Sequence, residues 1–109
     1  MSHVIVMVDS QEDQVPLFFK LCSDHLSIEA IPRKALAINI EGMKDKSIRE
    51  HEVMMWTPHF VVLKNSSGQE ITLRRDGRMV VRKADTEQVA REAATNVMRL
   101  ALKEFGSRA

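Results

Sequence analysis

The chain has 109 residues, enough for one hydrophobic core and too few for two, so a single domain over residues 1–109 is expected. Hydrophobic residues make up 44% of the chain and charged residues 28%, a balance that excludes an intrinsically disordered protein. The single cysteine excludes an intrachain disulfide, and no apolar run fits a signal peptide or a membrane span. A cytoplasmic protein without membrane contact is therefore expected.

The net charge of +1 is distributed unevenly along the chain. Residues 1–63 carry six Lys/Arg and nine Asp/Glu, a net charge of −3, whereas residues 64–109 carry ten and six, a net charge of +4. This asymmetry favours a surface for nucleic acid or an acidic protein in the second half. An uneven scatter of charge over a small domain explains it equally well.

The first half predicts a strand, a helix and a second strand. Residues 3–8 are rich in β-branched side chains and predict a short buried strand. A helix is expected from about Val15 to His25, because apolar residues recur there at helical spacing. Residues 27–52 predict little beyond a strand around Ala35 to Ile40, which a polar loop over 41–47 follows.

The second half predicts four strands and a long helix. The strands are expected at 53–56, 60–64, 71–74 and 78–83. The dipeptide Asp76-Gly77 predicts a tight hairpin with a primed turn, which needs positive φ angles. Asp85 is the expected N-cap of the helix, with Gln88 completing a capping box, and Gly106 is the expected end.

Together these elements predict an α+β fold in the order β-α-β-β-β-β-α. One antiparallel sheet of four or five strands carries two helices packed on one face. Alternation along the hairpin divides its side chains between the two faces of the sheet. The side chains expected to point to the helices are Ile71, Leu73, Met79 and Val81. Those expected on the uncovered face are Thr72, Arg74, Val80 and Arg82.

The run from Ile71 to Glu87 resembles the end of one repeat of the TATA-box-binding protein family, where a strand, a turn, a Met-Val-Val type strand and a second turn lead into a long helix. The similarity extends upstream to 57–60, which matches a Phe-Pro-Gly-Leu stretch of the family, and covers about residues 50–105. More weakly, it includes the first strand and helix. It implies one repeat of that fold, with the uncovered sheet face as the DNA-facing side.

Two departures from the family pattern weigh against DNA bending. The family wedges two phenylalanines per repeat between base steps, and the matching positions here are Thr57 and Arg74. The chain also holds one repeat where the family has two. The resemblance therefore implies a shared fold more than recognition of a TATA box.

Two functions remain open. The first is a non-catalytic nucleic-acid-binding module that contacts phosphates, without intercalation, through the basic residues Arg74, Arg78, Arg82 and Lys83. The alternative is a protein-interaction or regulatory module that keeps the fold and does not bind DNA, and a plain solvated sheet face would also explain these charges. A homodimer is expected in either case, because a lone repeat leaves an open sheet face and an edge strand.

No enzyme, metal or cofactor site is predicted. His51-Glu52 opens like a zinc-protease helix motif, but Met55 stands where the second histidine belongs. No glycine-rich loop precedes a helix, and no serine lies in a nucleophile-elbow context. Within Met54-Met55-Trp56, two of the three side chains are expected in the core.

Overall fold

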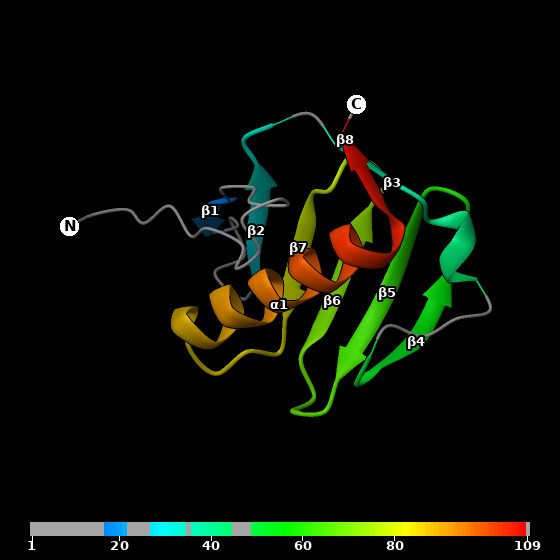
Figure 1. The fold of residues 1–109 in the computed structure, drawn as a ribbon. Coiled ribbons are helices and arrows are strands. Elements are labelled where there is room, and N and C mark those ends of the chain that lie inside the picture. Colours follow the sequence, from blue (N-terminus) through cyan, green and yellow to red (C-terminus); the bar gives the residue numbers. More distant parts are fainter. Residues whose placement is uncertain (1–16, 22–26, 35, 45–48, 109) are drawn as a thin grey trace.

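The computed structural model describes residues 17–21, 27–34, 36–44 and 49–108. The elements in chain order are β1 (Leu17–Leu21), β2 (Ser27–Pro32), β3 (Leu36–Ile38), the 3₁₀ helix η1 (Glu41–Met43), β4 (His51–Trp56), β5 (Phe60–Asn65), β6 (Glu70–Arg74), β7 (Met79–Arg82), α1 (Glu87–Phe105) and β8 (Gly106–Arg108) (Figure 1).

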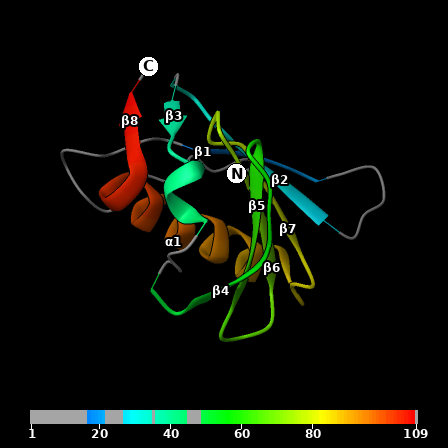
Figure 2. The same cartoon turned by 90° about the vertical axis from the view of Figure 1, so that its right-hand side faces the viewer.

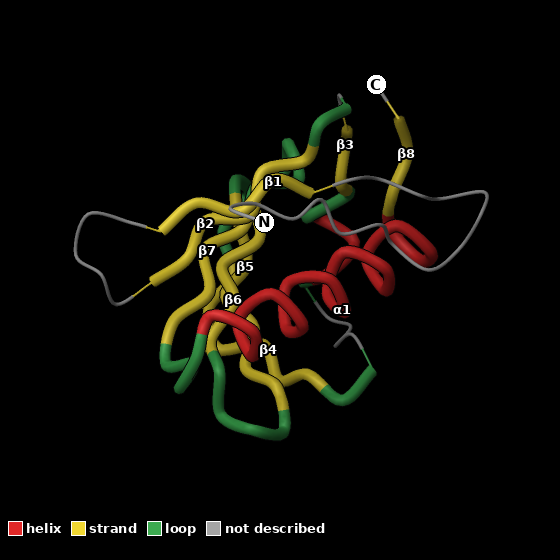
Figure 3. The backbone as a smooth tube through the Cα atoms, turned by 90° about the vertical axis from the view of Figure 1, so that its left-hand side faces the viewer, coloured by secondary structure: helices red, strands yellow, loops and turns green. Residues whose placement is uncertain are grey.

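A six-stranded antiparallel sheet forms one layer, in the order β1-β2-β7-β6-β5-β4. The helix α1 forms a second layer across one face of that sheet, and Figure 2 shows it on one side only. The short strands β3 and β8 pair with each other in a separate two-stranded sheet beyond the C-terminal end of α1 (Figure 3). The other face of the six-stranded sheet carries no described helix.

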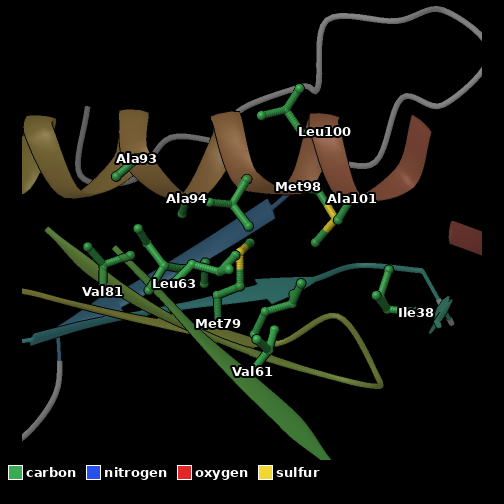
Figure 4. Packing of buried hydrophobic residues seen from close by; sticks show 14 of the residues in the cluster. Ile38, Val61, Leu63, Met79, Val81, Ala93, Ala94, Met98, Leu100 and Ala101 are labelled. Carbon is green, nitrogen blue, oxygen red and sulfur yellow. The ribbon is translucent and has the colours of Figure 1, made fainter. Parts of the chain in front are cut away.

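The core lies between α1 and the sheet, where buried aliphatic and methionine side chains meet small helix residues (Figure 4). Val61 and Met79 from the sheet and Ala94, Met98 and Ala101 from α1 are fully buried. Four of the buried residues of α1 are alanines, at positions 90, 93, 94 and 101. Burial of each larger side chain contributes roughly 1.5–3 kcal/mol, so this layer provides most of the driving force for folding.

The expectation of two helices is wrong, because residues expected in the first helix form strand β1. All five residues of β1 pair with β2, from Leu17 opposite Pro32 to Leu21 opposite Ile28. A short apolar run such as Leu-Phe-Phe-Lys-Leu suits a helix or a strand equally, and pairing with a distant strand decides between them. The fold is thus an α+β sheet of six strands with one C-terminal helix. The rest of the expected first strand and helix lies outside the described residues.

The strand β2 was not expected. The strand predicted around Ala35 to Ile40 is shorter than expected and belongs to a different sheet. Leu36–Ile38 pairs with β8 and not with the main sheet. The segment expected as a polar loop contains η1, whose Met43 is fully buried. Trp56 fixes η1 to the sheet, because its indole Nε1–H donates to the Ile40 carbonyl at 2.8 Å.

The second half follows the prediction, with two local corrections. Its four strands are confirmed to within two residues at each end, and all pair antiparallel. The hairpin loop has three residues, because Arg74 N–H bonds to the Arg78 carbonyl and Gly77 N–H to the Arg74 carbonyl. Gly77 has a φ of 90° while Asp76 is not in the positive-φ region, as in a type I turn followed by a glycine bulge.

The N-cap of α1 is Thr86 and not Asp85. The Thr86 hydroxyl accepts the Val89 backbone N–H at 3.1 Å, while Thr86 itself has extended φ and ψ angles. This is the standard geometry of a threonine N-cap, and Glu87 then lies in the first turn, where negative charge is favoured. The position three residues after Thr86 is Val89, so the expected capping box with Gln88 is wrong. No helix among the described residues is both long and apolar enough to cross a membrane.

Candidate interaction surface

The face of the six-stranded sheet that points away from α1 is called the open face below. Residues directly opposite each other on neighbouring antiparallel strands lie on the same face, so the strand register defines its rows. The predicted division of the hairpin is confirmed: Ile71, Leu73, Met79 and Val81 are buried under α1. Thr72, Arg74, Val80 and Arg82 lie on the open face and are half-buried or exposed.

One row of the open face consists of charged residues of alternating sign. Glu52 on β4 lies opposite Lys64 on β5, Lys64 opposite Glu70 on β6, and Glu70 opposite Arg82 on β7. Neighbouring strands are about 4.8 Å apart, so the backbone positions of the four residues follow one another at about that spacing. This charged row reads −, +, −, + from the β4 edge inwards.

The adjacent row is mostly apolar. Across the same four strands it contains Met55, Val62, Thr72 and Val80, and on β2 it continues to Glu29. Val62, Thr72 and Val80 are half-buried, whereas 54% of Met55 is exposed. This apolar row lies directly beside the charged row on the open face.

The placement of two of Met54-Met55-Trp56 in the core is wrong, because only Trp56 packs against it. The register of β4 on β5 shifts between Val53 and Met55, which indicates a β-bulge at Met54. Both methionines are about half exposed, at 47% and 54%. Flexible, polarizable side chains of this kind are common where a surface adapts to a partner.

The four basic residues predicted to bind nucleic acid lie on or beside the open face, and three of them contact carboxylates. Arg74 Nη2 lies 2.9 Å from Asp76 Oδ2 in the hairpin turn. Lys83 Nζ lies 3.0 Å from Glu70 Oε2, and Arg78 Nη1 lies 3.8 Å from Glu29 Oε2. Arg82 is exposed at the end of the charged row. Exposed pairs of this kind are worth about 0–1 kcal/mol, so they balance charge more than they stabilise the fold.

The turn geometry explains how the arginines of the hairpin are presented. The Asp76 carboxylate accepts the Arg78 backbone N–H at 3.0 Å and the Arg74 guanidinium on its other oxygen. Arg74 and Arg78 are therefore neighbours across the hairpin, one on β6 and the other just before β7. Phe60 on β5 lies opposite Arg74 in the register. A row of Phe60, Arg74 and Arg78 thus borders the apolar row on the side away from the charged row.

The acidic members of the open face were not predicted. Among the described residues this face carries Lys20, Lys64, Arg74, Arg78 and Arg82 together with Glu29, Glu52 and Glu70. Alternation along β4 could have placed Glu52 on one face of the sheet. It could not have identified Lys64 as the residue opposite Glu52, because the β-bulge and the pairing register determine that neighbour. Nothing in the sequence indicated that Glu29 lies on this face, since β2 was not expected.

The described residues contain no group of three or more His, Cys, Asp or Glu side chains that could hold a metal ion. Comparison with protein-family models, curated proteins and solved structures finds no match for this chain.

Proposed function

We propose that this protein is a non-catalytic interaction module that forms a two-fold symmetric homodimer through its open face. The observation that carries the proposal is the sign pattern of the charged row, Glu52–Lys64–Glu70–Arg82. This pattern is complementary to itself when it is reversed. Isologous dimers require that property, because the same patch must serve both partners.

A two-fold axis along the strands, between β5 and β6, pairs every charge of the row with an opposite one. Glu70 of one protomer then lies over Lys64 of its partner, and Arg82 over Glu52, each pair occurring twice. Stacked sheets pack about 10 Å apart with strand directions about 30° from each other, a separation that side chains of these lengths bridge. The contacts nearest the axis, Glu70 with Lys64, are the least disturbed by that rotation.

The same axis also matches the two other rows. Thr72 lies over Val62 of the partner and Val80 over Met55, so the apolar row is buried against itself. Arg74 lies over Phe60 of the partner, an arrangement in which a cation–π contact contributes about 0.5–1 kcal/mol or more. Apolar burial supplies the affinity in this arrangement, and the charged row fixes the register.

The open face is less suited to binding nucleic acid. Arg74, Lys83 and Arg78 each lie within 4 Å of a carboxylate, and Glu52 and Glu70 lie within the rows that a phosphate backbone would approach. Affinity for a duplex depends on the number of phosphates that the protein neutralises. Carboxylates among the cations reduce the number of phosphates that this face can neutralise. We therefore favour a homodimer interface over a nucleic-acid-binding surface.

Sedimentation velocity over a concentration series tests the proposal. Wild-type protein is expected to dimerise, and Lys64→Glu to raise the dissociation constant at least about tenfold, equivalent to ~1.4 kcal/mol, because it places like charges together at two symmetric contacts. Lys103→Glu is the matched control, since Lys103 is exposed in the last turn of α1, away from the open face. It is expected to leave the dimer unchanged.

Two results would contradict the proposed dimer. One is a wild-type monomer at high micromolar concentration, and the other is a dimer that Lys64→Glu and Lys103→Glu affect equally. A fluorescent DNA duplex titrated at about 50 and 200 mM salt distinguishes the nucleic-acid alternative. Tight binding that falls steeply with salt and weakens in Arg74→Ala/Arg82→Ala would favour that alternative.

A further inference from the structure

The described methionines fall into two groups that differ in accessibility. Met43, Met79 and Met98 are fully buried in the core, at 0% exposure. Met54 and Met55 are adjacent on β4, the last strand of the six-stranded sheet, and are 47% and 54% exposed. Oxidation of a thioether requires that the oxidant reach the sulfur. Among the methionines that the structure describes, these two are therefore the ones that a dissolved oxidant modifies first.

The β-bulge in β4 determines which of the two methionines belongs to the open face. Val53 lies opposite the buried Leu63, and Met55 lies opposite the preceding residue of β5, Val62, on the open face. Met54 is the extra residue of the bulge and has no residue of β5 opposite it in the register. Without the bulge, Met54 would take the place opposite Val62. Met55, and not Met54, is therefore a member of the apolar row.

The neighbours of Met55 in the proposed dimer are apolar or acidic. Within its own protomer Met55 lies opposite Val62, and the axis between β5 and β6 places it over Val80 of the partner. The partner's β2 continues beyond β4, and the next residue of that row is the partner's Glu29. Valine side chains form no hydrogen bonds, and an ionised carboxylate only accepts them. None of these three side chains can therefore donate a hydrogen bond to an oxidised sulfur.

Oxidation converts Met55 from an apolar side chain into a polar one. Hydrogen peroxide transfers one oxygen atom to the thioether: its O–O bond breaks, an S–O bond forms, the sulfur loses two electrons, and the peroxide is reduced to water. In the monomer, water solvates the new sulfoxide oxygen. In the dimer this oxygen is buried against valines without a donor, and the two-fold symmetry repeats that cost. Oxidation of Met55 therefore favours the monomer.

We propose that Met55 is a redox-sensitive modification site, at which oxidation by a peroxide dissociates the homodimer and reduction of the sulfoxide restores it. This inference rests on the proposed function, because it concerns the same interface. Methionine sulfoxide reductases reverse the step with two thiols, which form a disulfide while the sulfoxide oxygen leaves as water. Since the partner covers Met55 in the dimer, the sulfur is oxidised in the monomer, and dimerisation protects it.

Sedimentation velocity before and after limited treatment with hydrogen peroxide tests this proposal. Mass spectrometry identifies conditions under which Met54 and Met55 are oxidised and the three buried methionines are not. The oxidised wild-type protein is expected to have a dissociation constant at least about tenfold higher than the untreated protein. Methionine sulfoxide reductases with a thiol reductant are expected to restore the original value. Met55→Leu keeps an apolar side chain of similar size and is expected to dimerise equally before and after treatment.

Met54→Leu is the matched control, because position 54 is adjacent and almost equally exposed. It is expected to remain as sensitive to peroxide as the wild-type protein. Both leucine variants keep the single cysteine, so an effect of cysteine oxidation would appear in both. Met55→Gln introduces a polar side chain without an oxidant and is expected to weaken the dimer at least about fivefold, whereas Met54→Gln is expected to have little effect. Circular dichroism verifies that each glutamine variant is folded.

The outcomes distinguish failure of this proposal from failure of the proposed dimer. A wild-type protein that is monomeric before treatment would refute both. A dimer that persists with Met55 oxidised would refute the role of Met55 and leave the homodimer standing, as would equal peroxide sensitivity of Met54→Leu and Met55→Leu. At equal protein concentration, Met55 is expected to be oxidised faster in Lys64→Glu than in the wild-type protein, because the weaker dimer leaves it uncovered. Equal rates in the two proteins, with a wild-type dimer present, would place Met55 outside the interface.

Discussion

At the residue scale, a side chain is disfavoured at Gly68 and Gly77 for different reasons. Both positions have a positive φ, but only Gly77 is also crowded by neighbouring side chains. Gly68 and Gly77 have nearly the same φ, 91° and 90°. A Cβ at position 68 would meet no atom within 4 Å, whereas one at position 77 would lie 2.7 Å from Leu36 Cδ1 and 3.2 Å from Pro32 Cγ. Leu36 is itself buried, so it has little room to move.

We expect Gly77→Ala to destabilise the protein more than Gly68→Ala does. Both substitutions place an alanine at positive φ, at a cost of about 1–3 kcal/mol. Gly77→Ala adds overpacking against Leu36, worth about another 1–3 kcal/mol. Urea unfolding followed by circular dichroism measures the difference, and an equal or larger loss in Gly68→Ala would show that Leu36 does not constrain the turn.

At the element scale, the start of α1 depends on one hydroxyl. Thr86→Ala removes the acceptor of the Val89 N–H and is expected to lower the free energy of unfolding by about 1 kcal/mol. Asp85→Ala leaves that bond intact and is expected to cost only a few tenths of a kcal/mol, through the helix dipole. Thermal unfolding of the two variants compares them directly, and a larger loss in Asp85→Ala would return the cap to Asp85.

Elements formed by local contacts were predictable from the sequence, and those formed by distant ones were not. The β6–β7 hairpin and α1 carry their own signals, a Gly77 turn and helical spacing of apolar residues. By contrast, Leu17–Leu21 is a strand because β2 pairs with it, and β2 in turn pairs with β7, about fifty residues further along the chain. No property of a five-residue apolar run contains that information.

For the open face, positions within the hairpin were predictable from the sequence, and neighbours on other strands were not. Alternation correctly assigned Thr72, Arg74, Val80 and Arg82 to the open face, since the side-chain period of a strand is fixed. The carboxylates beside them come from β2, β4 and the outer end of β6, and their positions depend on the pairing register. A surface that seemed basic along one hairpin is mixed in charge once its neighbours are present.

At the scale of the whole molecule, the domain offers two unlike surfaces on opposite sides of one sheet. The open face is broad, with rows of charged and apolar side chains, whereas the helix side carries a smaller polar pocket lined by Glu50, His51, Asn65 and Glu92, among others. The six strands between them are hydrogen-bonded to one another from β1 to β4. Variants of one surface are therefore expected to leave the other unchanged.

The self-complementary charged row predicts that two weakened variants restore each other. Lys64→Glu alone and Glu70→Lys alone should each be folded by circular dichroism and dimerise at least about tenfold more weakly than wild type, since each places like charges together at both symmetric contacts. An equimolar mixture should form a heterodimer, because Glu70 of the first variant then faces Lys64 of the second, and the new glutamate at position 64 faces the new lysine at position 70. Sedimentation velocity of the mixture and of each variant alone measures this, with tighter association expected in the mixture than in either variant. A mixture that associates no better than the single variants would mean that the axis does not lie between β5 and β6.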